Sequence, residues 1–302
     1  MIKLHKERQG ELIIVAESTL WGLFPIITIL SFRGISPLVS FGGSTLIAAI
    51  FFGLVLTIKH KWKEVKDVTA YKDILLATFF IGFLMYPLYF FGLKYTSAGN
   101  ASIVDLTAEI FFSYLLFHVW KKDHLPTQHV VGSLLMITGA CIVLIPNVKE
   151  FHAGDLLILA EAFVAPFGNL YQRRARTKVS SECILFVRSL ITGVAILFFA
   201  FLLKDPISPK SISRSLPFLL INGVLLLGFS KILWIEGIHR IAVTKAAAIN
   251  SIQPLVTLFF AWILLHNLPT IWQLASIVPM FFGIILLGKK NNSNQLSNEK
   301  DL

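Results

Sequence analysis

The hydrophobic residues of this chain gather in about ten long runs, separated by short segments that carry most of the charged side chains. A helix needs about 20 mostly apolar residues to cross a bilayer, and the runs have that length. They are continuous and lack the alternation of a membrane β-barrel. The pattern predicts an all-α membrane protein with ten transmembrane helices, near Leu12–Phe32, Pro37–Ile58, Asp73–Leu93, Ala98–Trp120, Gln128–Pro146, Asp155–Tyr171, Glu182–Leu203, Leu216–Gly237, Ala242–His266 and Ile271–Gly288.

The runs repeat. GELIIVAE at Gly10–Glu17 and GDLLILAE at Gly154–Glu161 lie 144 positions apart, and each opens a long apolar run. Downstream, TLIAAI at 45–50 matches SLITGV at 189–194, and SAGNAS at 97–102 matches AVTKAA at 242–247. We therefore expect two copies of one unit, residues 10–147 and 154–290, followed by a polar cytoplasmic tail at 291–302.

Each unit contains five predicted helices. Because five is odd, the second unit enters the membrane from the side opposite to the first, and the two units are inverted repeats. Inverted repeats are typical of secondary transporters, since exchanging the conformations of the two halves converts an inward-open state into an outward-open one.

Composition agrees with a membrane protein: 55% of the residues are hydrophobic and only 15% are charged. The net charge of +10 does not indicate nucleic-acid binding, because the basic residues lie in short connecting segments. Most of them fall on the side of the N-terminus, so the positive-inside rule predicts that both termini are cytoplasmic. Cys141 and Cys183 lie inside apolar runs with no metal-binding or disulfide spacing, and we expect no metal site and no cofactor.

Several segments resemble the EamA-type branch of the drug/metabolite transporter superfamily. They are Trp21-Gly22, LKYTSAGNAS at 93–102, IHRIAVTKAAAINSIQP at 238–254, and the LPT tripeptides at 125–127 and 268–270. The resemblance implies a small-molecule carrier of the bacterial inner membrane. The chain departs from the family's pattern at Asp123 and His266, where Glu is usual, and at Glu109, where Pro is usual. No specific substrate therefore carries over.

Ionisable residues inside the predicted helices are the candidate functional groups. An ionised side chain at mid-membrane costs about 2.5 to 3.5 kcal/mol or more and normally faces a cavity or a partner. Counting about 1.5 Å of rise per residue predicts two layers and a midplane group. The inner layer holds Glu17, Arg188 and Lys231, the outer layer holds Asp105 and Glu161, and Glu109, Gln253 and Asn250 lie near the midplane.

We expect a central cavity in which Glu109, Asn250, Gln253 and Trp234 contact the substrate, with an aromatic wall of Tyr86, Tyr89 and Phe90. Glu17 would close an inner gate with Arg188 or Lys231, and Glu161 with Asp105 would form an outer mouth. The alternatives are a structural ion pair for Glu17, simple hydration for Glu161 and Asp105, and packing for the aromatic residues.

The function predicted from these features is secondary transport of an amino acid or amino-acid derivative, with S-adenosylmethionine among the candidates. Glu109, Glu17 or Glu161 could carry a proton, but exchange and facilitated transport stay open. So do a multidrug or metabolite exporter and the choice between monomer and homodimer. His118 and Asp123 match the HxxxxD spacing of lipid acyltransferases, a remote alternative. No GxxxxGK[ST] loop indicates ATP binding.

Overall fold

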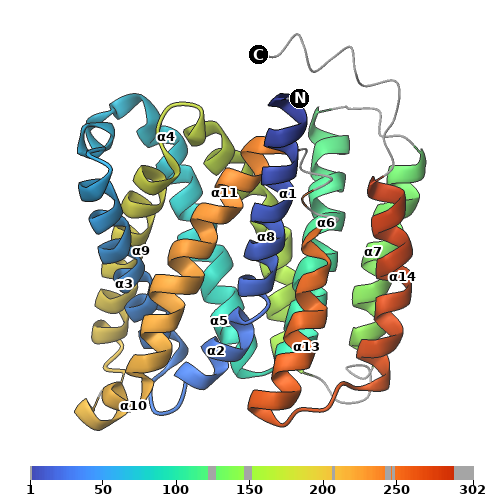
Figure 1. The fold of residues 1–302 in the computed structure, drawn as a ribbon. Coiled ribbons are helices and arrows are strands. Elements are labelled where there is room, and N and C mark those ends of the chain that lie inside the picture. The colour runs from blue at the N-terminus through green and yellow to red at the C-terminus, as the bar shows by residue number, and fades with distance from the viewer. Residues whose placement is uncertain are drawn as a thin grey trace.

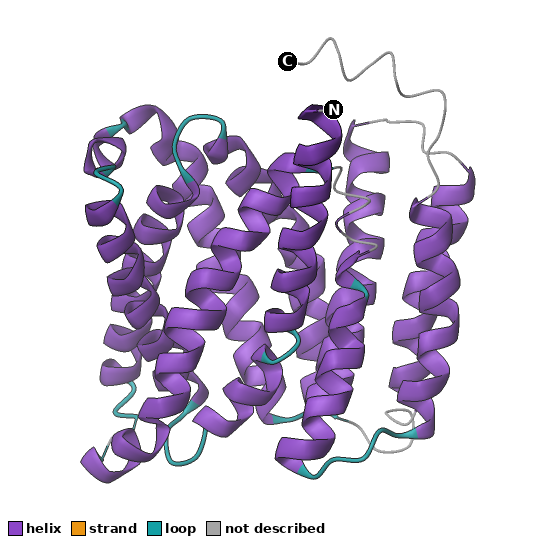
Figure 2. Ribbon diagram, viewed as in Figure 1, coloured by secondary structure: helices purple, strands orange, loops and turns teal. Residues whose placement is uncertain are grey.

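The computed structural model describes residues 2–121, 127–145, 152–205, 208–241, 246 and 249–288, and every regular element within these ranges is helical (Figure 2). Six helical stretches are long and apolar enough to cross a membrane, and three shorter apolar helices accompany them. Together with α6 (Ala98–Lys121), they account for the ten helices that the apolar runs predict. The predicted fold class is confirmed.

The first repeat holds five spans, two of which are divided into shorter elements. Its elements are α1 (Ile2–Trp21), α2 (Phe24–Ser31), α3 (Pro37–Ile58), the 3-10 helix η1 (Trp62–Lys66), α4 (Val68–Ala77), the π-helix η2 (Thr78–Met85), α5 (Tyr86–Lys94), α6, and α7 (Thr127–Leu144).

The second repeat follows the same order. Its elements are α8 (Ala153–Arg176), α9 (Ser181–Leu202), α10 (Pro209–Leu220), the π-helix η4 (Ile221–Ser230), α11 (Lys231–Arg240), α13 (Ile252–Leu265) and α14 (Ile271–Gly288). Of the predicted helix 242–266, the structure describes residue 246 and residues 249–266. The predicted tail 291–302 lies outside the described residues.

The two repeats have opposite orientations in the bundle. In Figure 1, α1 begins and α14 ends at the upper end. The beginning of α8 lies at the other end, where Asp155 accepts hydrogen bonds from Thr96 and Asn100 beside the start of α6. The upper end is therefore the end that the distribution of basic residues predicts to be cytoplasmic.

The first span is broken between α1 and α2, whereas the sequence predicts one continuous helix. Pro25 lies in the first turn of α2, where its missing N–H is tolerated. Because the break frees the carbonyl group of Gly22, the Thr257 hydroxyl of α13 donates to it at 2.7 Å. A Cβ atom on Gly22 would lie 2.8 Å from Val256, so glycine also permits this close approach.

The third and eighth spans each contain a π-helical segment in the middle, and hydropathy alone does not distinguish such a segment from an α-helix. Pro87 follows η2 by two residues, and its ring disrupts the hydrogen bonds of the preceding turn. π-Helical segments occur frequently at functional sites. In this chain they end immediately before Tyr86 and Lys231, the first residues of α5 and α11.

The two repeats pack against each other helix by helix. α3 lies along α9, and α7 lies along α14. At the α7–α14 crossing, a Cβ atom on Gly132 would lie 2.9 Å from the carbonyl oxygen of Gly283. Small residues allow such close backbone contact between membrane helices. The remaining spans, first, third and fourth of each repeat, surround the candidate site.

Candidate substrate and coupling site

An ion pair joins the first span of one repeat to the third span of the other. The Lys231 ammonium lies 3.4 Å from Oε1 of Glu17, and the Ser230 hydroxyl donates to the same oxygen at 3.3 Å. Lys231 also lies 3.1 Å from the centroid of the Trp21 ring, a cation–π contact. Glu17 is 1% exposed, and its other oxygen has no hydrogen-bond partner in the described part of the chain.

A second acidic group lies between α6 and α8. The carboxyl groups of Asp105 and Glu161 are within hydrogen-bonding reach of each other, and both residues are buried. No N–H or O–H donor among the described residues reaches either oxygen of Glu161. Adjacent negative charges repel, so this contact is favourable only when one of the two groups is protonated. Both side chains are buried in this conformation.

Glu109 lies one helical turn from Asp105 on α6. Its Oε1 accepts a hydrogen bond of 2.8 Å from Nδ2 of Asn169 on α8. Lys231 attracts Glu109, Asp105 and Glu161 electrostatically as well as Glu17. Carboxyl groups that the sequence assigns to different depths therefore all interact with a single ammonium group.

Arg188 does not pair with Glu17. Its guanidinium donates to Oε1 of Gln172 at 2.5 Å and lies 6.0 Å from the ring of Tyr86. Arg188 and Tyr86 border a small cavity of about 10 Å³, near the smallest volume that holds a water molecule.

The second repeat contributes two amide residues near the first span, Asn250 and Gln253. Oδ1 of Asn250 accepts a hydrogen bond of 2.5 Å from Ser18, which is the neighbour of Glu17. Gln253 is 1% exposed, and its Nε2 has no acceptor among the described side chains. Trp234 is partly buried against the apolar core. The structure therefore places Asn250 next to Glu17, and Trp234 in packing contacts.

The predicted aromatic wall includes two residues that sequence reasoning missed. Phe24 stacks on Trp21 with 4.1 Å between ring centroids and on Tyr89 with 5.4 Å, and Phe90 packs edge-on against Phe24. Tyr86 and Tyr89 are fully enclosed, and the Tyr89 hydroxyl has no hydrogen-bond partner in the described residues. These rings form an apolar surface beside the charged cluster.

Asn169 and Gln172 are the other residues that the sequence reading missed. Both lie on α8, eight and eleven positions after Glu161. Residues separated by whole turns share a helix face, so the position of Glu161 predicts that these two side chains also face the interior. The polar stripe along α8 was the available signal.

Ion pairs are also concentrated at the upper end of the bundle. Six ion pairs are found among the described residues, and all except Glu17–Lys231 lie at this end. Three of these join the two repeats: Glu182 contacts Lys59 and Lys61, and Asp73 contacts Lys178 at 2.7 Å.

The sequence was compared with known families. Residues 8–145 and 152–289 each match the EamA-like transporter family. The chain belongs to this family. It is therefore a multi-pass membrane transporter and not an enzyme, as predicted. The acyltransferase interpretation of His118 and Asp123 is set aside; Asp123 and the side chain of His118 lie outside what the structure describes.

Individual relatives match almost the whole chain. The uncharacterized transporter YoaV of Bacillus subtilis is 23% identical over 283 residues, which cover 90% of this chain and 94% of YoaV. An uncharacterized transporter of Methanothermobacter thermautotrophicus is 28% identical and covers 89% of this chain and 86% of its own length. A crystal structure with 16% identity superposes with a TM-score of 0.71, covering 93% of this chain and 96% of that chain, which supports the fold.

Proposed function

We propose that this EamA transporter moves a small polar metabolite with a positive charge across the bacterial cell membrane by alternating access. An amino acid or amino-acid derivative fits best, and S-adenosylmethionine, with its ammonium and sulfonium groups, is one candidate. The observation that supports this most is a group of four carboxyl groups that interact with one ammonium group: Glu17, Asp105 and Glu161 are buried, and Glu109 is partly buried.

The excess of carboxyl groups explains the preference for a cation. Lys231 already pairs with Glu17, and Arg188, which donates to the neutral Gln172 amide, makes no ion pair with a carboxylate among the described residues. The remaining carboxyl groups must be neutralised by protons or by a cationic ligand, because unpaired buried charges are strongly unfavourable. A cationic substrate would displace protons from Glu109, Asp105 and Glu161, and this competition couples its movement to a proton gradient.

The ion pairs at the upper end support a gate there. The three ion pairs that join the repeats would separate when the halves move apart, as alternating access requires. We propose that these ion pairs form the cytoplasmic gate of the transporter.

A multidrug or metabolite exporter is the second candidate. The stacked rings of Trp21, Phe24 and Tyr89 beside the carboxyl groups favour a cation with an apolar or aromatic body. An aromatic quaternary ammonium dye distinguishes this candidate from an amino-acid carrier.

The test is transport by purified protein in proteoliposomes. Radiolabelled amino acids, S-adenosylmethionine and an aromatic quaternary ammonium dye are supplied with and without an imposed proton gradient. We expect saturable transport of a cationic compound that responds to the gradient and is lost in Glu109→Gln. The control, Glu11→Gln, makes the same chemical change midway along α1 and should transport normally. Undiminished transport by Glu109→Gln, or preference for anionic substrates, would contradict the proposal.

A further inference from the structure

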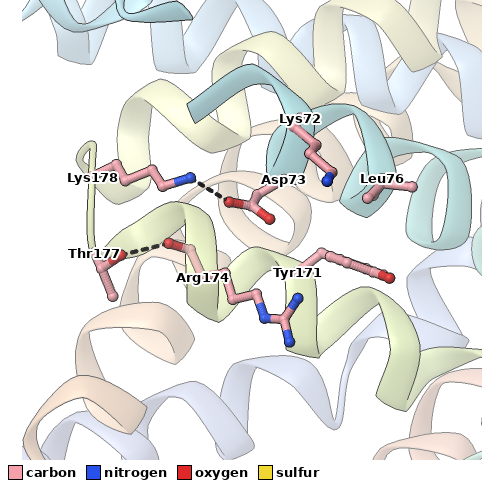
Figure 3. A pocket seen from close by; sticks show the side chains of 7 residues that line it. All are labelled: Lys72, Asp73, Leu76, Tyr171, Arg174, Thr177 and Lys178. Carbon is pink, nitrogen blue, oxygen red and sulfur yellow. Dashed lines mark hydrogen bonds and ion pairs between the residues drawn. The ribbon is translucent and has the colours of Figure 1, made fainter. Parts of the chain in front are cut away.

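A hollow lies at the upper end of the bundle, away from the charged cluster. It has a volume of about 480 Å³ and lies between α4 and α8. Figure 3 shows Lys72 and Leu76 of α4 facing Tyr171 and Arg174 of α8 across it. Cavities of this size hold small organic ligands.

The hollow carries an uncompensated positive charge. Its single carboxylate, that of Asp73, binds the Lys178 ammonium at 2.7 Å, and Lys178 also donates to the carbonyl group of Thr69 at 3.0 Å. These contacts hold Lys178 and Asp73 as a neutral pair. Lys72 and Arg174 make no ion pair within the described ranges, and both are exposed. Two cations thus face a hollow that lacks an anion to match them.

The Arg174 side chain, which lines the hollow, packs on an aromatic ring. Its guanidinium lies 5.6 Å from the centroid of the Tyr171 ring, and Tyr171 stacks on Phe80 at 5.9 Å. A guanidinium oriented in this way presents several N–H donors in one plane, which suits phosphate oxygens. The bound group is therefore expected to be a phosphate.

Apolar side chains continue from the hollow toward the membrane. Leu75 and Phe79 lie one and two turns below Lys72, and they are 48% and 50% exposed. Phe163, two turns below Tyr171 on α8, is 50% exposed. Apolar surface directly below a basic site fits acyl chains under a headgroup, whereas a free anion would have no use for it.

We propose that the hollow between α4 and α8 binds the phosphate headgroup of an anionic phospholipid, with its acyl chains along Leu75, Phe79 and Phe163. The site joins the first repeat to the second, because Lys72 and Arg174 come from opposite repeats. A bound headgroup stabilises the conformation in which these helices are adjacent. Anionic lipid therefore favours closure of the upper end of the bundle.

The test uses the full-length protein in nanodiscs of phosphatidylcholine with or without phosphatidylglycerol. Lipid retention is measured by native mass spectrometry, and the thermal unfolding midpoint is measured in parallel. Wild-type protein should retain phosphatidylglycerol and unfold at a higher temperature with it. Lys72→Gln with Arg174→Gln should weaken retention at least about tenfold, from roughly fivefold per basic group, and remove the stabilisation.

The matched control is Lys63→Gln with Lys66→Gln. These two exposed lysines of η1 lie at the same end of the bundle but do not line the hollow. The control should retain phosphatidylglycerol as the wild type does. Equal losses in both double variants would mean that only the surface charge attracts the lipid, and the proposal would be overturned.

A separate arm distinguishes a lipid from a free anion. Inorganic phosphate is added to protein in phosphatidylcholine nanodiscs. Little stabilisation by phosphate, together with strong stabilisation by phosphatidylglycerol, supports the lipid site. Equal stabilisation by both, or none by phosphatidylglycerol, overturns it. Because both substituted side chains are exposed, the double variant should fold. The single variants Lys72→Gln and Arg174→Gln provide a check that folding is retained.

Discussion

Glu17 and Glu161 occupy the same place in the duplicated segments, yet their surroundings differ. Each lies on the first span of its repeat. Glu17 is bound by the Lys231 ammonium and the Ser230 hydroxyl, whereas Glu161 faces the carboxyl group of Asp105 and receives no donor from the described residues. The duplication kept the acidic residue at this position and changed the groups around it.

The cause of the difference lies on the third span of each repeat. Lys231 is the first residue after η4, and the residue in the same place after η2 is Tyr86. A phenol in that position cannot neutralise Glu161 as the ammonium neutralises Glu17. Inverted repeats with similar backbones allow the two halves to exchange conformations. The unequal side chains then decide which conformation is more stable under given conditions.

The largest expected effect comes from removing the cation. Lys231→Met leaves the buried Glu17 without a cation, with only the Ser230 hydroxyl as a donor, and removes the attraction of Lys231 for the other carboxyl groups. We expect the free energy of unfolding to fall by about 3 to 5 kcal/mol. Thermal unfolding in detergent measures the loss. Adding Glu17→Gln to Lys231→Met should recover part of it, and simple additivity of the two changes would contradict the ion pair.

Glycines in the two π-helical segments test whether the backbones are equivalent. A Cβ atom on Gly223 would lie 2.6 Å from the carbonyl oxygen of Ser44, which cannot move alone, so Gly223→Ala should cost about 1 to 3 kcal/mol. The corresponding atom on Gly82 would meet the end of the Thr192 side chain, which can rotate. Gly82→Ala should therefore cost less.

The control for these glycine variants is Gly43→Ala on α3. Its added methyl group would lie 3.5 Å from Leu219, an ordinary contact, and should leave the unfolding temperature unchanged. If Gly223→Ala were equally harmless, close packing at η4 would be refuted.

Glu161→Gln tests the other side of the comparison. No donor is lost, and the repulsion from Asp105 is removed, so stability should stay within about 1 kcal/mol of wild type or rise slightly. Transport should lose its response to a proton gradient. Glu17→Gln should behave differently, with lower stability because Lys231 loses its partner. Equal unfolding temperatures in the two variants would contradict the difference that we infer between the surroundings of Glu17 and Glu161.

The smallest effect concerns a carboxylate outside the membrane spans. Hydrogen bonds from the hydroxyl and amide of Thr69 lower the pKa of Asp67, which caps α4. A lowered folded-state pKa stabilises the protein above pH 4 or so, and this contribution disappears as the pH falls through the folded value. Asp67→Asn keeps the cap and should slightly reduce the loss of stability on acidification, as circular dichroism can measure.

Hydropathy and repeat detection were sufficient for the helices and the inverted arrangement. They do not reveal the break at Gly22 or the π-helical segments, because hydropathy does not depend on the hydrogen-bonding pattern. Depth counting suggested that Glu17 and Lys231 lie at one level. It also placed Asp105 and Glu161 at one level, but it could not show their interaction with Lys231, because depth along a helix does not say which helices are neighbours. To predict the partners Asn169 and Gln172, one must ask which other residues share the helix face of Glu161.

The pairing of α3 with α9 and of α7 with α14 has a consequence for biosynthesis. Each helix of the first repeat makes its most extensive packing contact with a helix of the second repeat, which the ribosome makes later. Until the second repeat is made, the side of α7 that carries Gly132 and the side of α3 that packs on α9 contact lipid or the insertion machinery. The first repeat therefore matures only when the second arrives, and the two halves expressed from separate genes should accumulate only when both are present.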